Sequence, residues 1–225
     1  MPAKPPRVMS RTAVADAIRH GIRGGELAPG QRLVEAELCK AFGTTRGVVR
    51  TALTELVHEG LVEHIANRGA RVRVVDLPEA LQIAEVRMAL ESLCAARAAE
   101  RISEAQIAQL CQLGRKLSEH AHSGDTTAYA ELTHQLFEIY VRIAEQPAAQ
   151  EILTRLRARN IRHRFRLTYR PGRPKIALPY WLALIDALCR RDPEAARLAV
   201  QRHAANVREA MTALGAEQNL FPALY

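Results

Sequence analysis

Apolar residues near the amino end recur every three or four positions, the spacing of one face of a helix. Val14, Ile18 and Ile22 follow this spacing until Gly24 ends it. The pair Pro29-Gly30 then indicates a turn, because proline fixes φ and glycine adopts conformations that other residues avoid. The chain therefore begins with an amphipathic helix that is closed by a turn.

Two shorter helices are expected next, over residues 35–42 and 46–59, with a glycine-containing turn at 43–45 between them. This is the helix-turn-helix arrangement. One face of the second helix is apolar and consists of Val49, Ala52, Leu53, Leu56 and Val57. Arg46 and Arg50 fall on the opposite face, since residues four apart share a face. One side of this helix is thus expected to be buried and the other free to bind.

The hydrophobic period changes to two after Gly60, which indicates a β-hairpin. Its strands are expected at 61–65 and 70–75, with a turn at 66–69. A hairpin placed directly after a helix-turn-helix makes a winged helix-turn-helix. The wing carries or adjoins three arginines, Arg68, Arg71 and Arg73.

The remainder of the chain predicts only helices. Asp76 is an N-cap and Pro78 lies in the first turn, so we expect a boundary between a DNA-binding domain, 1–75, and an effector-binding and dimerisation domain, 76–225. The expected helices cover residues 78–101, 103–123, 125–145, 147–169, 174–190 and 192–213. The predicted fold class is therefore mainly α, with an N-terminal winged helix-turn-helix domain and a C-terminal all-α helical bundle whose interior can hold a ligand.

The charge of the chain favours a polyanionic partner. The net charge is +8, and residues 1–75 hold 12 Lys and Arg against 7 Asp and Glu. Only Phe42 among the aromatic residues precedes residue 76. The first domain thus favours phosphates and the second favours apolar ligands.

Several function classes are excluded by the motifs that the chain lacks. The cysteines form no C-x-x-C pair, so we expect four reduced thiols in the cytoplasm, at Cys39, Cys94, Cys111 and Cys189. No apolar run can span a bilayer, and the amino end lacks a secretory signal. No nucleotide-binding, hydrolase or metalloprotease motif is present. We therefore expect neither an enzyme, nor a cofactor, nor a membrane partner.

Three segments resemble the N-terminal domain of GntR-family transcription regulators: GELAPGQRL at 25–33, FGTTRGVVRTAL at 42–53 and EGLV at 59–62. The resemblance covers about residues 12–75. It implies DNA contacts by Arg32, Thr45, Arg46, Arg50, Arg68 and Gly69. Arginine can bond guanine O6 and N7 with both nitrogens of its fork, which discriminates between bases.

The sequence also departs from the family pattern. Gly47 and Val48 replace the usual polar or proline residues, and Ala36 stands where many relatives carry an arginine that touches DNA. The operator sequence of a relative therefore cannot be transferred to this chain.

The helical remainder resembles the FadR-type branch of the family, whose effector domain is called FCD. The resemblance rests on RMALE at 87–91, on Ala187-Leu188 leading to Asp192, and on Arg202-His203. Many members of that branch hold a divalent cation with one aspartate and three histidines. Here the corresponding residues are Thr133, Phe137, Trp181 and His203, so only one of the four ligands remains. Stable zinc or nickel binding needs three or four ligands, so no metal site is expected.

The replaced ligands point to an organic effector. Phe137 and Trp181 would make the cavity aromatic, with Tyr140, Phe165, Tyr169 and Tyr180 as candidates to join them. Arg87 could neutralise a carboxylate. The expected effector site therefore comprises Arg87, Thr133, Phe137, Trp181 and His203. The alternative is that the aromatic rings simply fill the core of the bundle.

A basic stretch stands out within residues 152–175, which hold nine Lys and Arg and no acid. On one continuous helix, a single stripe is formed by Arg155, Arg159, Arg162 and Arg166. The stripe is consistent with auxiliary DNA contact, with an anionic effector, or with a solvated face paired with acids of neighbouring helices.

We therefore predict a homodimeric transcription repressor that binds a near-palindromic operator on double-stranded DNA. A small organic effector, a carboxylate of aromatic or acyl character, would release it without a metal. The alternatives are a metal-dependent sensor or enzyme whose bundle carries the chemistry, and a non-specific architectural or RNA-binding protein.

Overall fold

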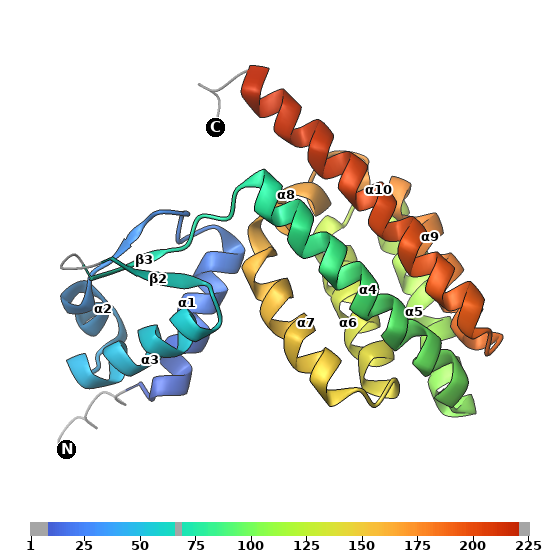
Figure 1. Ribbon diagram of the computed structural model, residues 1–225, viewed down its shortest axis with the longest axis horizontal. Coiled ribbons are helices and arrows are strands. Elements are labelled where there is room, and N and C mark those ends of the chain that lie inside the picture. Colours follow the sequence, from blue (N-terminus) through green and yellow to red (C-terminus); the bar gives the residue numbers. More distant parts are fainter. Residues whose placement is uncertain (1–8, 66–68, 221–225) are drawn as a thin grey trace. The chain divides into compact units, whose positions relative to one another are not determined.

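The computed structural model describes residues 9–65 and 69–220 of the chain. It divides into two compact units, residues 1–75 and 76–225 (Figure 1). Within the described ranges there are ten helices and three short strands, so the mainly α fold class predicted from the sequence is confirmed.

The first unit is a three-helix domain with a small sheet. Its elements, in chain order, are α1 (Arg11–Gly24), β1 (Arg32–Leu33), α2 (Glu35–Phe42), α3 (Arg46–His58), β2 (Val62–Ile65) and β3 (Gly69–Val72). Helix α1 begins where the Ser10 hydroxyl accepts a hydrogen bond from the Ala13 amide, and it ends at Gly25, whose φ of 83° needs glycine. The core of the unit is made by α1 and α3, which bury Val14, Ile18, Leu53 and Leu56.

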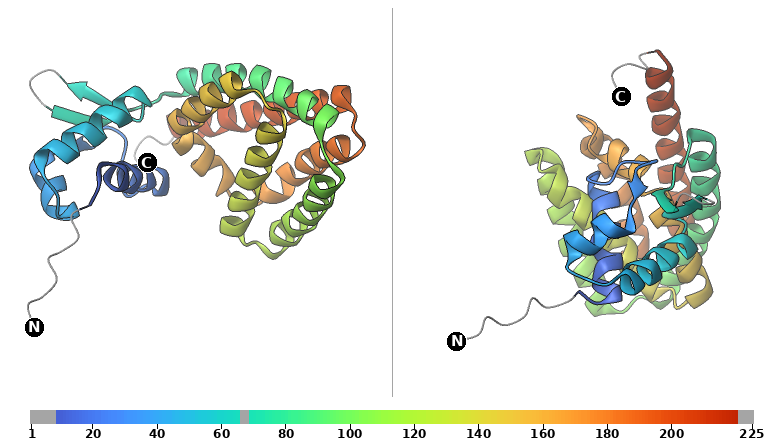
Figure 2. Two further views of the ribbon diagram at one scale, coloured as in Figure 1. Left: turned by 90° about the horizontal axis from the view of Figure 1, so that it is seen from below. Right: turned by 90° about the vertical axis from the view of Figure 1, so that its left-hand side faces the viewer.

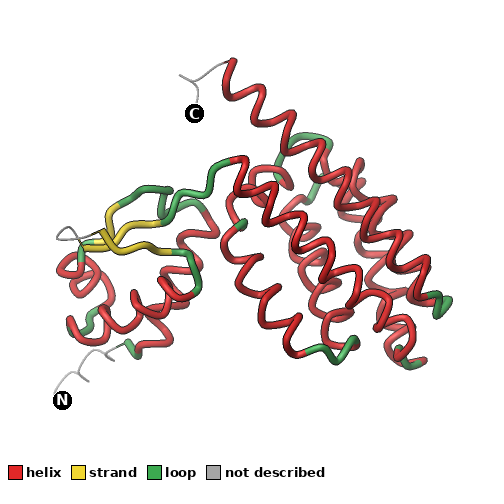
Figure 3. The backbone as a smooth tube through the Cα atoms, in the orientation of Figure 1, coloured by secondary structure: helices red, strands yellow, loops and turns green. Residues whose placement is uncertain are grey.

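The wing has one strand more than the sequence predicted. Strand β1 pairs antiparallel with β3, and β3 pairs with β2, so the order in the sheet is β1-β3-β2 (Figure 3). Leu33 lies opposite Ala70 and both are buried. A run of two residues is too short to carry a visible alternation, which explains why a simple hairpin was expected.

The second unit consists of helices alone within its described residues. They are α4 (Leu77–Arg101), α5 (Glu104–Ser123), α6 (Thr126–Ile143), α7 (Pro147–Arg159), α8 (Ile161–Thr168), α9 (Arg173–Cys189) and α10 (Pro193–Leu220). The expected caps are present, because the Asp76, Ser103 and Asp192 side chains each accept a hydrogen bond from an amide three residues on. The long helices α4 and α10 lie side by side in both views (Figure 2).

Two helices differ clearly from the expectation. The single helix predicted over 147–169 is broken at Asn160 into α7 and α8, so residues 76–220 form seven helices and not six. Asn160 is buried, and its side-chain amide donates a hydrogen bond of 3.2 Å to the Ala80 carbonyl of α4. This tertiary contact outweighs the helical periodicity of the flanking residues. The last helix also continues beyond the predicted residue 213, to Leu220.

The core of the second unit lies between α4, α5, α6, α7, α9 and α10. Its largest fully buried side chains include Tyr129 and Tyr140 of α6, together with Leu117, Leu153, Leu184 and Leu188. Among the helices that the structure describes, none is both long and apolar enough to cross a membrane.

Candidate functional site

Helix α3 presents two arginines at its amino end. The Thr45 hydroxyl caps the helix by accepting a hydrogen bond of 3.5 Å from the Val48 amide, so Arg46 occupies the first helical position. The side chains of Arg46 and Arg50 are exposed on the face opposite the buried residues of the helix. Free amide groups and the helix dipole favour phosphate at such an end. The geometry suits a helix that lies in a DNA groove.

Arg50 is held by α2. Its guanidinium donates from Nε to Glu35 Oε1 at 3.1 Å and from Nη2 to Glu35 Oε2 at 3.2 Å. The hydrogen bond from Arg50 and its positive charge lower the pKa of Glu35. The carboxylate is therefore ionised at neutral pH and fixes the direction of the arginine.

The acidic side chains of α3 face away from this arginine pair. Glu55 and Glu59 both accept hydrogen bonds from Arg19 of α1, at 2.8 and 2.6 Å. Arg19 thereby joins α1 to α3 and neutralises the carboxylates. Helix α3 thus separates its charges, with the acids against α1 and the arginines on the open face.

The remaining candidates of the first unit lie on the sheet. Arg32 is exposed on β1, opposite Arg71 of β3, and Arg71 Nε donates to Glu63 Oε1 of β2 at 2.6 Å. Gly69 opens β3 with a φ of 86°, a conformation that favours glycine. Arg68 lies outside the described residues.

A buried ionic cluster lies in the second unit, centred on Glu91 of α4. Arg87 donates to Glu91 Oε1 from Nη2 at 2.6 Å, and the hydroxyl of Tyr140 donates to Oε2 at 3.3 Å. Burial alone would raise the pKa of Glu91, but the charges of Arg87 and Arg157 outweigh it and lower the pKa. Glu91 is therefore an ionised carboxylate inside the bundle.

Arg157 of α7 completes one side of the cluster. Its Nη1 atom lies 4.0 Å from Glu91 Oε1, and its Cζ atom lies 3.5 Å from the centre of the Phe137 ring. Burial, reinforced by the charge of Arg87, lowers the pKa of Arg157 to about 10. The guanidinium remains charged at neutral pH and is stabilised by the face of the aromatic ring.

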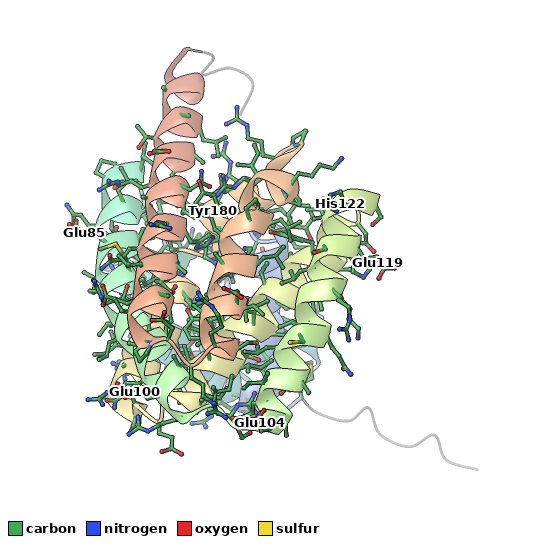
Figure 4. All side chains as sticks on the ribbon, turned by 90° about the vertical axis from the view of Figure 1, so that its right-hand side faces the viewer. Glu85, Glu100, Glu104, Glu119, His122 and Tyr180 are labelled. Carbon is green, nitrogen blue, oxygen red and sulfur yellow. The ribbon has the colours of Figure 1, made fainter. Side chains whose placement is uncertain are left out.

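His203 of α10 adjoins the same charges. Its ring lies 3.9 Å from the Trp181 ring and 6.4 Å from the Tyr180 ring, centre to centre, and Figure 4 shows Tyr180 at the seam of α9 and α10. Burial lowers the pKa of His203 to about 3; Glu91 opposes the shift, and the charge of Arg173 adds to it. The imidazole is therefore neutral at physiological pH.

Comparison with known families identifies both units. The model described as bacterial regulatory proteins, gntR family, matches residues 10–72, and the FCD domain model matches residues 82–206, more than half of the chain. The chain belongs to the GntR family. It carries the FCD effector domain of that family, and together these two domains make it a transcription regulator and not an enzyme.

Curated relatives and solved structures agree with this assignment. The transcriptional repressor RspR of Escherichia coli K12 is 26% identical over 193 residues, which are 86% of this chain and 85% of RspR. The regulator Rv0043c of Mycobacterium tuberculosis H37Rv is 30% identical over 177 residues, 78% of this chain and 70% of the relative. The fold is also similar to that of McbR/YncC of E. coli, with a TM-score of 0.76 at 22% identity over 95% of this chain and 100% of McbR.

The FCD domain brings together four of the five candidate effector residues. Arg87 and Phe137 belong to the Glu91–Arg157 cluster, and the Trp181 ring contacts the His203 ring at an angle of 43°. The Thr133 hydroxyl instead donates to the Ala130 carbonyl of its own helix at 2.8 Å. Phe165 and Tyr169 do not join this cluster, because their rings stack on each other at 4.3 Å and are exposed at the carboxyl end of α8.

Three members of the cluster were missed by sequence reasoning. Glu91 stands four residues after Arg87, a spacing that pairs charges on a helix, but this signal is common on exposed faces. Arg157 and Arg173 were grouped with the surface arginines of residues 152–175, although both are buried. No pattern in the sequence separates a buried arginine from the exposed ones around it.

The residues at the four expected ligand positions, Thr133, Phe137, Trp181 and His203, do not fit the divalent cation that many FCD domains hold. The ring of Phe137 is covered by the guanidinium of Arg157, and Trp181 fills the space beside the only remaining histidine. Three cationic side chains near His203 would repel a metal ion. Across the described residues, no group of three His, Cys, Asp or Glu side chains is arranged to hold one.

The stripe of arginines predicted on one continuous helix is wrong, since the break at Asn160 divides it between α7 and α8. Arg155 is paired with Glu151 at 2.7 Å, and Arg159 is hydrogen bonded to Glu79 of α4. These two arginines are therefore paired with carboxylates of the same domain.

Proposed function

We propose that this regulator is a repressor that binds its operator through α3 and is released by an organic anion bound in the FCD domain. It would act in the cytoplasm, where it meets chromosomal DNA. Arg46 and Arg50 would read base edges, while Thr45, Arg32, Arg68 and Gly69 would contact the DNA around them. The relative RspR is a transcriptional repressor, which supports the direction of the control.

The observation that carries the effector proposal is the charge balance of the buried cluster. Arg87, Arg157 and Arg173 are cationic, and the main charges that act on His203 are these three and the carboxylate of Glu91. Arg173 is buried, and the groups whose charges act on it are Tyr129, Tyr180 and Arg170, with no carboxylate among them. An unpaired charge in a protein interior is costly, so the cluster favours the entry of an anion.

The residues around the charges define the rest of the effector. Phe137, Tyr140 and Trp181 supply aromatic surface, and the neutral ring of His203 can donate or accept a hydrogen bond. An organic acid with a flat or aliphatic body matches such a site better than inorganic phosphate does. The effector is therefore proposed to be an aromatic or acyl carboxylate, held without a metal.

A pair-wise comparison of acids with their amides tests this proposal. Benzoate, phenylacetate and hexanoate are each added to the reduced full-length protein, alongside benzamide, phenylacetamide and hexanamide. At least one acid is expected to raise the thermal midpoint and to release promoter DNA in a fluorescence anisotropy titration. Its amide, which has the same shape and no charge, is expected to do neither, because it leaves the guanidinium groups unpaired.

The variant Arg173→Gln provides the internal control. It should keep the basal DNA affinity and lose the response to the acid. An equal response to acid and amide would contradict the charge argument. Stoichiometric zinc or nickel in the dialysed protein would contradict binding without a metal.

We further propose that the regulator is a homodimer that binds a near-palindromic operator. Val86 and Leu93 of α4 are 52% and 44% exposed and lie seven residues apart, hence on one face of the helix. Exposed large apolar side chains in register favour contact with a second copy. Light scattering should give the mass of two chains, and Leu93→Glu should give the mass of one. A monomeric wild-type protein in the presence of operator DNA would contradict the proposal.

A further inference from the structure

Two cysteines that are distant in the sequence meet in the bundle. The Sγ atoms of Cys111 on α5 and Cys189 on α9 lie 3.9 Å apart, although the residues are 78 positions apart in the chain. Both are free thiols. A disulfide needs a sulfur separation of about 2 Å, and rotation of both side chains about their Cα–Cβ bonds provides movement of this size.

The packing of α5 against α9 explains why these sulfurs approach. Gly114 lies one turn after Cys111, and a Cβ atom built on it would lie 3.4 Å from Ile185 and 3.5 Å from Leu182. Ile185 in turn lies one turn before Cys189. The helices α5 and α9 are therefore antiparallel and closely packed. The two cysteines lie one turn beyond the close contact that the missing side chain of Gly114 allows. Figure 4 shows the two helices next to each other, with Glu104 and Glu119 marking the course of α5.

The two thiols differ in their surroundings. Cys111 is exposed, whereas Cys189 is partly buried. Burial and the hydrogen bond with Cys111 raise the pKa of Cys189 to about 11. Cys111 is thus the thiol that an oxidant reaches first, and Cys189 is the neighbour placed to react with the oxidised sulfur. Cys94 is fully buried by contrast, and Cys39 belongs to the first unit.

We propose that Cys111 and Cys189 form a reversible disulfide when the protein meets a peroxide. The Cys111 sulfur attacks the peroxide, the O–O bond breaks, and a sulfenic acid and water form. The Cys189 sulfur then attacks the sulfenic acid, and its proton leaves with the hydroxyl group as a second water. In sum, two thiols and one hydrogen peroxide give one disulfide and two waters.

The cross-link fixes α5 to the carboxyl end of α9. The earlier turns of α9 carry Tyr180 and Trp181, whose rings face His203. Closing a long segment of chain also restricts the unfolded state, so the oxidised protein should unfold at a higher temperature.

Chemical mapping of the oxidised full-length protein tests the proposal. Reduced protein is treated with a small excess of hydrogen peroxide, and its free thiols, intact mass and peptides are measured under denaturing conditions. We expect the loss of two of the four thiols, a mass decrease of about 2 Da, and a linked peptide that contains both Cys111 and Cys189. The thermal midpoint should rise by several degrees, and dithiothreitol should reverse all four changes.

The variants Cys111→Ser and Cys39→Ser separate the proposal from general oxidation. Cys111→Ser should give no linked peptide and no rise in the midpoint, while Cys39→Ser should respond like the wild type. The proposal is overturned if Cys111 accumulates as sulfenic or sulfinic acid without pairing. Disulfides between two chains, in place of one within the chain, would overturn it equally.

Discussion

Arg50 of α3 and Glu35 of α2 form a two-point hydrogen-bonded pair, with both guanidinium-to-carboxylate distances at 3.1 to 3.2 Å. The pair joins the two helices of the helix-turn-helix across the open face. It presents Arg50 in one direction, because the planar fork of arginine bonds a carboxylate with both nitrogens only in a fixed orientation. A DNA base that accepts hydrogen bonds from Arg50 must compete with the carboxylate of Glu35.

Removal of either arginine of α3 should weaken specific DNA binding. Arg46→Ala and Arg50→Ala are each expected to weaken operator binding by about 10- to 100-fold, since one two-point base contact discriminates by this order. Fluorescence anisotropy with operator and scrambled DNA measures the effect. Arg115→Ala removes an exposed charge from α5 and is the matched control. If Arg50→Ala and Arg115→Ala bind the operator alike, α3 is not the reading helix.

Neutralising Glu35 should have the opposite effect on affinity. Glu35→Gln frees Arg50 from its ion pair and removes a negative charge that faces the phosphates, so binding is expected to tighten several-fold. The preference for operator over scrambled DNA should fall, because Arg50 loses its fixed direction. Glu37→Gln, an exposed acid on the same helix, serves as the control. Unchanged discrimination in Glu35→Gln would show that the pair does not orient Arg50.

The sequence was sufficient to predict the elements whose signals are local. The turn glycines and the cap residues Ser103 and Asp192 placed most helix ends correctly, since caps act within one turn. Asn160 was not predicted to break a helix, because the break depends on its contact with Ala80, 80 positions away. Strand β1 was missed because its pairing with β3 is set by the sheet and not by its own two residues.

The candidate sites also divide into features that local sequence predicts and features that depend on contacts between distant residues. The exposure of Arg46 and Arg50 on α3 could be predicted from their periodicity, because a helix separates its buried and exposed faces in a regular way. The pairs Glu91–Tyr140 and Cys111–Cys189 join residues that are 49 and 78 positions apart in the chain. No spacing rule connects such residues, so the folded structure was needed to find them.

Loss of the buried carboxylate should destabilise the FCD domain. Glu91→Gln keeps the size of the side chain but leaves the guanidinium groups of Arg87 and Arg157 without their counter-charge. Removing one partner of a buried ion pair costs about 3–5 kcal/mol. Urea unfolding at pH 7 measures the change. Glu100→Gln, which breaks an exposed pair with Arg97, should cost at most about 1 kcal/mol. Equal stability of the two variants would contradict the assignment of Glu91 as an internal counter-ion.

The pH dependence of stability should report the neutral state of His203. The unfolded chain binds a proton at this residue below about pH 6.5, whereas burial holds the pKa in the folded protein at about 3. The unfolded state thus carries more protons between these values, so the free energy of unfolding falls as the pH falls. The slope from this residue approaches about 1.4 kcal/mol per pH unit midway between the two pKa values, where the unfolded state holds the proton and the folded state does not. His203→Asn should remove that slope between pH 7 and pH 5, while His122→Asn, on the surface of α5, should keep it. Parallel stability curves for wild type and His203→Asn would contradict this prediction. They would mean that the imidazole takes up its proton in the folded state, beside three guanidinium groups. The buried cluster would then have to be less cationic than its side chains indicate.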